Sequence, residues 1–205
     1  MTRKSALFIF FSILIAATSL FAQKNAGQSQ KRLAGITFSS FGNTEVLRFK
    51  QLEGAASYNP DKFFTVGINY LYSLNKTVEI ETGVEYSKHR IYIKPNLPPD
   101  MDNTPYSALF YLINIPFTLR VNFLKYCFVN GGLNLDIDPA ISSPIDNQNG
   151  IGGIIGLGIK YDSDSGFSAF INPYFKAHSL IPFSAVAYQQ RVMESGLRIG
   201  VFYKL

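Results

Sequence analysis

The sequence predicts an all-β protein, an eight-stranded antiparallel up-and-down transmembrane β-barrel after a cleaved signal peptide. Three observations predict it: alternating apolar and polar residues, connections that are short and long in turn, and an N-terminal export signal. In residues 64–73 the even positions are Phe, Val, Ile, Tyr and Tyr, and the odd positions are Thr, Gly, Asn, Leu and Ser. Successive side chains of a strand point to opposite faces, so this period indicates strands with one apolar and one polar face. Such strands suit a wall between lipid and a polar lumen.

The N-terminus has the features of a secretory signal. Arg3 and Lys4 precede an apolar stretch over residues 6–17, and the small residue Ala22 stands before Gln23. This order is typical of a signal peptide, so we expect residues 1–22 to be removed, 23–32 to be a polar leader and 33–205 to form the barrel. An uncleaved anchor is the alternative, although its apolar run falls short of the ~20 residues that a spanning helix needs.

Composition excludes several classes of protein. Apolar residues make up 47% of the chain, yet no second run approaches the length of a membrane-spanning helix. Cys127 is the single cysteine, so no intramolecular disulfide forms. Without Arg3 and Lys4 the chain has 17 basic and 14 acidic residues, a formal charge of +3. This mild and scattered charge gives no reason to expect nucleic acid as a partner.

Eight segments carry the strand pattern, and the connections between them alternate in length. Short turns at one end and longer loops at the other are typical of outer-membrane barrels, with the short turns on the periplasmic side. The expected strands are residues 33–40, 62–73, 77–94, 107–123, 126–137, 151–162, 166–178 and 194–205. The expected long loops are 41–61, 95–106, 138–150 and 179–193, and the short turns are 74–76, 124–125 and 163–165.

The last segment is predicted to close the ring against the first. Its apolar face carries Leu197, Ile199 and Val201, and the first segment would place Ile36 and Phe38 outward. Closure follows from physics, because each unpaired backbone group at a sheet edge in hydrocarbon costs several kcal/mol.

The polar faces of the expected strands carry charges of both signs. An eight-stranded barrel is just wide enough for its side chains to fill it, so we predict a charge-paired interior and not an open pore. Glu79 or Glu81 is expected near the level of Arg120, because the third and fourth strands are neighbours. The full predicted network is structural and consists of Glu79, Glu81, Glu85, Arg120, Lys160, Lys176, Arg198 and Lys204.

Catalytic, cofactor-binding and metal-binding residues are not predicted. His89 and His178 are the two histidines, and both are expected at the outer ends of strands, at a wet rim. Ser87 and Glu85 lie close to His89, which keeps a rim-active hydrolase as an alternative, although triads are recognised by geometry. A metal site built from both histidines and a carboxylate would need loops to converge. The glycines of residues 131–132 and 152–158 are not followed by a helix, so no dinucleotide-binding site is expected.

The segment YLINIPFTLR, residues 111–120, resembles the "YLEIPLLLK" strand of the PorT-like outer-membrane β-barrel proteins of Bacteroidetes-type bacteria. Residues 129–133, 156–161 and 197–205 are similar to other parts of that family, as is the signal end Leu-Phe-Ala-Gln. Asn114 stands where Glu is usual, and Leu205 replaces a terminal aromatic residue. The resemblance implies a barrel and a link to protein secretion, and it carries over no functional residue.

We therefore expect a non-enzymatic protein of the bacterial outer membrane with a structural or partner-binding role. Its partners would be outer-membrane lipid, the barrel-assembly machinery and a component of a secretion system or a surface protein, with no cofactor. The alternatives are a rim-active lipid or peptide hydrolase, a small-solute channel, and a soluble, secreted, lipocalin-like barrel that binds a lipid. Period two alone does not exclude the last, since that barrel would only invert the two faces.

Overall fold

The computed structural model describes residues 31–48, 56–98, 100–140, 143–184 and 188–205. Every regular element within these ranges is a β-strand, and none of these residues forms a helix long and apolar enough to cross a membrane. The predicted signal peptide and the leader up to residue 30 lie outside the described residues. The strands are β1 (Arg32–Arg48), β2 (Ser57–Asn59), β3 (Phe63–Ser73), β4 (Val78–Lys94), β5 (Tyr106–Phe123), β6 (Cys127–Ile137), β7 (Gly150–Asp162), β8 (Phe167–Pro182) and β9 (Gln190–Lys204).

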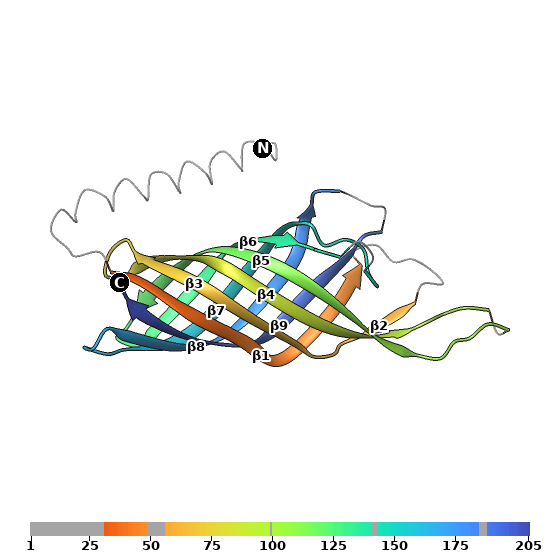
Figure 1. Cartoon of the computed structure of the whole chain (residues 1–205), viewed down its shortest axis with the longest axis horizontal. Helices are drawn as coiled ribbons and strands as arrows, with labels where there is room; N and C mark the ends of the chain where they lie inside the picture. The colour runs from red at the N-terminus through yellow and green to blue at the C-terminus, as the bar shows by residue number, and fades with distance from the viewer. Residues whose placement is uncertain (1–30, 49–55, 99, 141–142, 185–187) are drawn as a thin grey trace. The chain divides into compact units, whose positions relative to one another are not determined.

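The long strands form a closed antiparallel ring (Figure 1). Around the ring the order is β4, β3, β1, β9, β8, β7, β6 and β5, and β5 pairs again with β4. Closure is made by β1 and β9, with Ile36 opposite Val201 and Phe38 opposite Ile199. The predicted all-β up-and-down barrel is therefore confirmed. The short β2 pairs only with the end of β4 and was not expected, because three residues are too few to show a period.

The connections alternate as predicted. The turns after β3, β5 and β7 are short, and they share one end of the barrel with the start of β1 and the end of β9, where the amide of Leu205 donates to the carbonyl of Arg32 at 2.8 Å (Figure 1). The longer connections, after β1, β4, β6 and β8, lie at the other end. We call these the short-turn end and the loop end.

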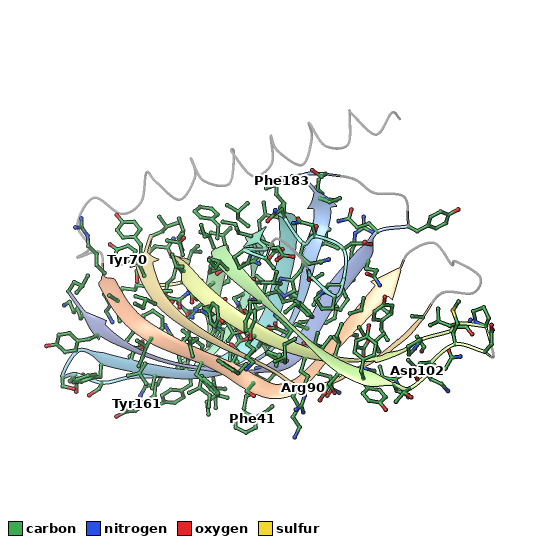
Figure 2. The ribbon with its side chains drawn as sticks, turned by 45° about the vertical axis from the view of Figure 1, so that its right-hand side comes forward. Phe41, Tyr70, Arg90, Asp102, Tyr161 and Phe183 are labelled. Atoms are coloured by element: carbon green, nitrogen blue, oxygen red, sulfur yellow. The ribbon has the colours of Figure 1, made fainter. Side chains whose placement is uncertain are left out.

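Most of the large apolar side chains of the described strands face outward. Ile36 and Ile68 are 68% and 72% exposed, and Figure 2 shows Phe41 and Tyr161 pointing away from the barrel. The polar positions between them, such as Asn69, are buried inside the ring. The alternative of a soluble barrel with an apolar interior is therefore wrong, because its faces would be inverted.

A bulge in β1 explains why this strand is longer than predicted. Its pairing with β9 shifts between Ser40 and Asn43, and Phe41 adopts a positive φ of 58°. An extra residue moves all later side chains to the opposite face. The side chains that point inward therefore belong to odd-numbered residues before the bulge, such as Ser39, and to even-numbered residues after it, such as Thr44. The alternation broke at residue 41, so the prediction ended the strand at 40 instead of 48.

The strands β8 and β9 also reach further toward the loop end than predicted. An irregularity in the pairing of β7 with β8 falls between Ala177 and Ile181, and Ser179 between them has a positive φ of 46°. The break in the period led the prediction to end β8 at residue 178, whereas it continues to Pro182. The strand β9 begins at Gln190, four residues before its expected start at 194.

The interior is layered along the barrel. An apolar cluster at the short-turn end consists of Leu33, Leu71, Phe128, Phe170 and Phe202. A second apolar cluster at the loop end consists of Ile91, Ile93, Phe110, Leu112, Ile145 and Val192. Charged and polar side chains fill the space between these clusters. The charges are thus enclosed by apolar packing at both ends.

Glycine on the lumen face makes room for the large side chains of the apolar cluster at the short-turn end. At Gly200 in β9, a Cβ atom would overlap the ring of Phe170. Gly131 in β6 is an outward position, between the exposed Val129 and Leu133. The nearest atom to a Cβ there is the carbonyl oxygen of Ile154 at 3.5 Å, which is an ordinary contact.

We predict that Gly200→Ala lowers the free energy of unfolding by about 1–3 kcal/mol, the usual cost of overpacking, as measured by urea titration of the refolded barrel. Gly131→Ala is the matched control and is expected to change it by less than about 1 kcal/mol. Equal losses in the two variants would contradict this account of the glycines.

Candidate functional site: the charged interior and its histidine cluster

A network of buried ion pairs occupies the middle of the lumen. Glu81 on β4 is fully buried and accepts from two guanidinium groups, with N–O distances of 2.7 Å to Arg120 and 2.6 Å to Arg198. Arg198 also contacts Glu85 at 3.0 Å, and Glu85 contacts the ammonium of Lys176 at 3.0 Å. Five of the eight predicted network residues therefore lie in one connected cluster.

The register of the strands creates these contacts. Glu79 lies opposite Arg120 across β4 and β5, and Glu81 lies two residues further along the same face. The guanidinium carbon of Arg120 stands 4.3 Å from the ring centre of Phe128 and 4.5 Å from that of Phe170. The apolar cluster at the short-turn end thus supports the first layer of charge by cation–π contact.

The three remaining predicted residues lie nearer the short-turn mouth. Lys160 contacts Glu79 at 3.4 Å and Asp162 at 3.5 Å. Lys204 is exposed and has no ion pair among the residues that the structure describes. It lines a cavity of about 230 Å³ at this mouth together with Glu79 and Lys160. The expectation that Lys204 lies inside the network is therefore wrong, because β9 ends there and its side chain reaches solvent.

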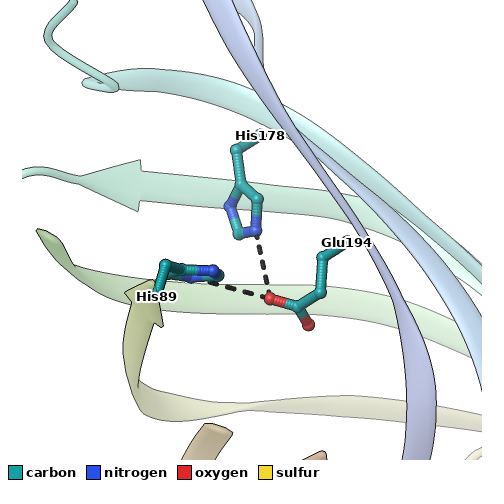
Figure 3. A group of neighbouring side chains, drawn as sticks. All are labelled: His89, His178 and Glu194. Atoms are coloured by element: carbon teal, nitrogen blue, oxygen red, sulfur yellow. Dashed lines mark ion pairs between the residues drawn. The ribbon is translucent and has the colours of Figure 1, made fainter. Parts of the chain in front are cut away.

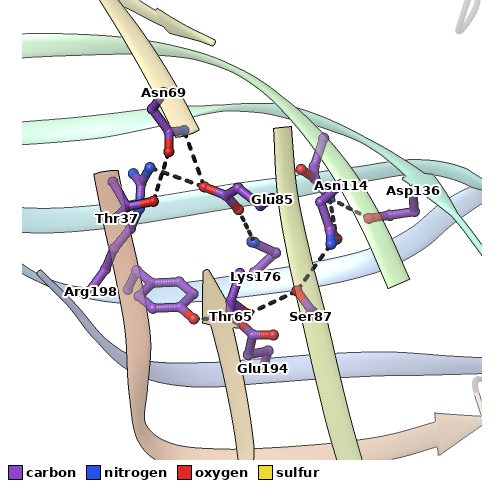
Figure 4. Close-up of polar contacts among 12 residues, drawn as sticks. Thr37, Thr65, Asn69, Glu85, Ser87, Asn114, Asp136, Lys176, Glu194 and Arg198 are labelled. Atoms are coloured by element: carbon purple, nitrogen blue, oxygen red, sulfur yellow. Dashed lines mark hydrogen bonds and ion pairs between the residues drawn. The ribbon is translucent and has the colours of Figure 1, made fainter. Parts of the chain in front are cut away.

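Neutral polar side chains extend the network toward the loop end (Figure 4). Thr37 donates to the Oδ1 atom of Asn69 at 2.7 Å, and the amide of Asn69 donates to Glu85 at 3.3 Å. Ser87 contacts Thr65 at 2.8 Å and accepts from Asn114 at 3.2 Å. Buried polar groups are costly unless they are hydrogen-bonded, and these contacts satisfy several of them.

His89, His178 and Glu194 converge in the layer next to the loop-end apolar cluster (Figure 3). The Nε2 atoms of His89 and His178 lie 3.7 Å and 3.5 Å from the Oε2 atom of Glu194. All three side chains have no exposed surface. The prediction that the two histidines lie at a wet rim is therefore wrong, because β4 and β8 continue past them and apolar residues cover the site.

The three residues come together from strands and not from loops. His89 lies on β4 and His178 on β8, which are opposite each other in the eight-membered ring, and Glu194 lies on β9. The expectation that such a group needs converging loops is therefore also wrong. In a narrow ring, inward side chains from opposite strands meet without help from loops.

Each of the three side chains is held by a second contact. The Nδ1 atom of His178 lies 2.8 Å from the carboxylate of Asp136, and the Nδ1 atom of His89 lies 2.9 Å from the hydroxyl of Thr44. The hydroxyl of Tyr174 donates to the Oε1 atom of Glu194. The bulge in β1 positions this site, because it turns Thr44 inward.

Aromatic rings fix the plane of His89. Its ring stacks on that of Phe110, with 4.8 Å between centres and 9° between planes, and on that of Phe63 at 5.9 Å and 21°. The ring of His178 meets it edge-on at 5.6 Å. These three ring contacts hold the imidazole of His89 in one orientation.

The arrangement needed for a serine hydrolase is not formed by these groups. Ser87 hydrogen-bonds Thr65 and Asn114, and no serine hydroxyl lies within hydrogen-bond distance of either histidine among the described residues. Thr44 does contact His89, but both are fully buried, so a substrate has no approach to them.

Sequence reasoning missed Thr44, Asp136, Tyr174 and Glu194 as members of the interior. A signal for three of them was present. Asp136 is an even position like Asn130 and Asn134 on β6, and Tyr174 and Glu194 are even positions like Lys176 and Arg198 on β8 and β9. Glu194 was overlooked because it stood at the expected start of a strand. Thr44 carried no such signal, because the bulge exchanges the inward and outward positions in the second part of β1.

Two acidic groups at the loop end lie outside the ring. The guanidinium of Arg90 donates to Asp61, with 2.7 Å between Nε and Oδ2, and this hydrogen bond holds the pKa of Asp61 below its ordinary value. Hydrogen bonds from Thr104 likewise lower the pKa of Asp102, whose Oδ1 atom lies 2.8 Å from the Thr104 amide nitrogen. Both carboxylates are thus charged at neutral pH and stabilise the local loop structure.

A hollow lies beside these loops. It has a volume of about 400 Å³, and its lining includes Tyr58, Ile93, Leu97, Tyr106 and Pro144. The residues come from β2, from the ends of β4 and β5 and from two loops. We call this hollow the outer groove.

Solved outer-membrane proteins are similar to this fold. The outer membrane protein OprG from Pseudomonas aeruginosa aligns with a TM-score of 0.51 and 15% identity, covering 86% of this chain and 95% of that one. The outer membrane protein AlkL, solved in lipid bilayers, aligns with a TM-score of 0.50 and 13% identity, covering 89% of this chain and 94% of that one. No family model and no curated protein matches the chain. The chain therefore has the fold of small outer-membrane barrels.

We predict that Arg120→Ala lowers the free energy of unfolding by about 3–5 kcal/mol, because it removes one partner of a buried ion pair and a ring contact. The measurement is the urea midpoint of the refolded barrel. Arg32→Ala changes an exposed arginine at the start of β1 and is expected to cost less than about 0.5 kcal/mol. Equal midpoints in the two variants would rule out a structural role for the network.

Proposed function

We propose that the chain is a non-enzymatic barrel of the bacterial outer membrane that contacts partners through its loop end. The observation that carries this proposal is the closed ring with an apolar outer face and an enclosed ionic interior. A closed ring is the β-structure that can span a bilayer, because all its backbone N–H and C=O groups are hydrogen-bonded between strands.

The outer face supports a lipid environment. Phe117, Ile155 and Leu157 are each about 60% exposed around the middle of the barrel, at 58%, 60% and 58%. An apolar belt of this extent in water would favour aggregation. In a bilayer the acyl chains of the lipids contact the belt instead of one another. The names of OprG and AlkL as outer-membrane proteins support the same location.

The interior argues against a channel. Two apolar clusters close the lumen at its ends, and the ion pairs of Arg120, Arg198 and Lys176 fill its middle. A solute would have to separate buried charges in order to pass, which costs several kcal/mol for each pair. The barrel therefore serves as a rigid support, and exposed segments carry the contacts.

The outer groove is the surface that we assign to a partner. Leu97 and Tyr106 of its lining are 46% and 53% exposed, and Met101 in the same β4–β5 connection is 55% exposed. Apolar side chains gathered at a hollow favour binding of a protein segment with apolar residues.

The sequence resemblance to PorT-like proteins supports a finer proposal. In it, the partner is a component of a protein-secretion system or a surface protein, and the barrel-assembly machinery inserts the chain. A hydrolase is not proposed, because the buried histidines have no serine partner among the residues described.

We expect the protein in the outer-membrane fraction of its cells, with a gel mobility that changes on boiling, because a closed barrel resists detergent until heated. The measurement is sucrose-gradient fractionation followed by electrophoresis of unboiled and boiled samples. Recovery in the soluble periplasmic fraction without a mobility change would contradict the proposed location.

We also expect a photo-crosslinking residue at Leu97, in the outer groove, to give a defined covalent adduct in intact cells. The matched control is the same residue at Tyr161, which is 63% exposed near the short-turn end. An adduct from Tyr161 alone would show that the partner binds at the short turns and not at the groove. The absence of an adduct from both positions would also contradict partner binding at the groove.

A further inference from the structure

We propose that His89, His178 and Glu194 form a buried binding site for one Zn²⁺ ion inside the lumen. Two imidazole nitrogens and one carboxylate oxygen are a known set of zinc ligands in proteins. The ligand atoms of the three residues already lie within 4.8 Å of one another.

The three ligand atoms can surround a tetrahedral ion after the two histidine rings move closer together. Zinc bonds of about 2.0–2.2 Å place neighbouring ligand atoms about 3.4 Å apart. The Oε2 atom of Glu194 lies 3.5 Å from the Nε2 atom of His178 and 3.7 Å from that of His89. The two distances to Glu194 therefore need to shorten by only a few tenths of an ångström. No two ligand atoms of the group are more than 4.8 Å apart, so closing the widest pair needs a movement of up to about 1.4 Å, shared between the side chains. A water molecule would take the fourth position.

The atoms that would bind the ion are those without another partner. His89 Nε2, His178 Nε2 and Glu194 Oε2 are fully buried and make no hydrogen bond. Three such atoms on three strands face one another (Figure 3). Leaving buried polar atoms unpaired is costly, and a shared cation would satisfy all three at once.

The surroundings orient the ligands for a metal. A zinc-binding histidine usually donates its other ring N–H to a carboxylate or another oxygen. Asp136 accepts from Nδ1 of His178, because an ionised carboxylate has no proton to donate. The backbone amide of Ser179 donates to the other oxygen of Asp136 at 2.9 Å and holds the carboxylate in place. With the proton on Nδ1, the Nε2 lone pair of His178 points at the site. The hydroxyl of Thr44 lies 2.9 Å from Nδ1 of His89 and would accept a hydrogen bond from this atom when Nε2 binds the ion.

The charge of the interior favours a cation at this point. Among the described side chains with 3% or less exposed surface, the carboxylates are Glu81, Glu85, Asp136 and Glu194, and the fixed cations are Arg120, Lys176 and Arg198. The ammonium of Lys176 is bound to Glu85 at 3.0 Å, so the second oxygen of Glu194 has no fixed cation of its own. The count leaves one carboxylate without a fixed cation, and the two charges of a bound zinc ion would more than offset it.

The position of the site indicates a structural ion and not a catalytic one. The loop-end apolar cluster lies on one side of it and the ion pairs on the other. An ion held there would tie β4, β8 and β9 together across the lumen. Because no substrate reaches it, its effect is on stability, as for any ligand that binds only the folded state.

The test uses the mature chain without a histidine tag, unfolded with a chelator and refolded with or without ZnCl₂. We expect one zinc per chain after desalting, measured by mass spectrometry, and a higher unfolding temperature than in the zinc-free sample. The chain has two histidines, so ¹⁵N labelling of histidine gives side-chain signals from His89 and His178 only. Zinc is expected to shift the Nε2 signals of both rings.

Variants decide whether the zinc lies at this site. His178→Gln and Glu194→Gln are expected to weaken zinc binding more than about 100-fold, since changes in outer-shell partners alone cost about 10–100-fold. Ser87→Ala, on the same face of β4 two residues from His89, is the control and is expected to keep the zinc.

Equal retention by all variants would place the ion elsewhere and overturn the proposal. If the ligand variants do not fold, the labelled wild-type chain decides: unmoved histidine signals and no retained zinc would show that a proton holds the cluster together.

Discussion

The ion pairs between Arg198 and the carboxylates of Glu81 and Glu85 tie β9 to β4 across the inside of the ring. All three side chains are buried, so none of the charges has water as an alternative partner. Removing one partner of such a pair leaves a charge uncompensated, at a cost of about 3–5 kcal/mol. The barrel therefore holds its cross-section through contacts that exist only in one register of the strands. The outer apolar face follows from the same alternation, because a strand that sends its charges inward must send the residues between them outward.

This arrangement also explains why the two ends of the lumen are apolar. Charges near a mouth can be solvated, as Lys204 is, and then contribute little to the fold. The aromatic rings of Phe128 and Phe170 cover Arg120 on one side, and Ile91 and Phe110 cover the histidine layer on the other. Within this enclosure, Lys176 and His178 from β8 reach groups on β4 at the opposite side of the ring.

The period of two was enough to predict the strands, their faces and the closure of the ring from the sequence. It failed where the chain leaves that period. The bulge at Phe41 reversed the parity of β1 and hid Thr44, and the irregularity near Ser179 shortened the predicted β8. His178 was placed at a rim because the predicted strand ended at residue 178. His89 was placed there although the end of β4 at Lys94 was predicted correctly, because the sequence did not show that the loop-end apolar cluster covers this level of the lumen. Which carboxylate meets which cation depends on register, and the sequence alone did not determine it.

The central claim is that the alternation separates lipid from a packed ionic interior, and spin labels on one strand test it directly. Single cysteines in a Cys127→Ser chain would carry labels at Phe117, Leu119 and Val121, which are exposed on β5, and at Thr118, which is buried. In lipid vesicles, the account predicts that oxygen reaches the three outer labels readily and that a water-soluble nickel reagent does not, whereas the label at Thr118 is immobile and shielded from both. Ready access of the nickel reagent to all three outer labels would place that face in water and contradict the account.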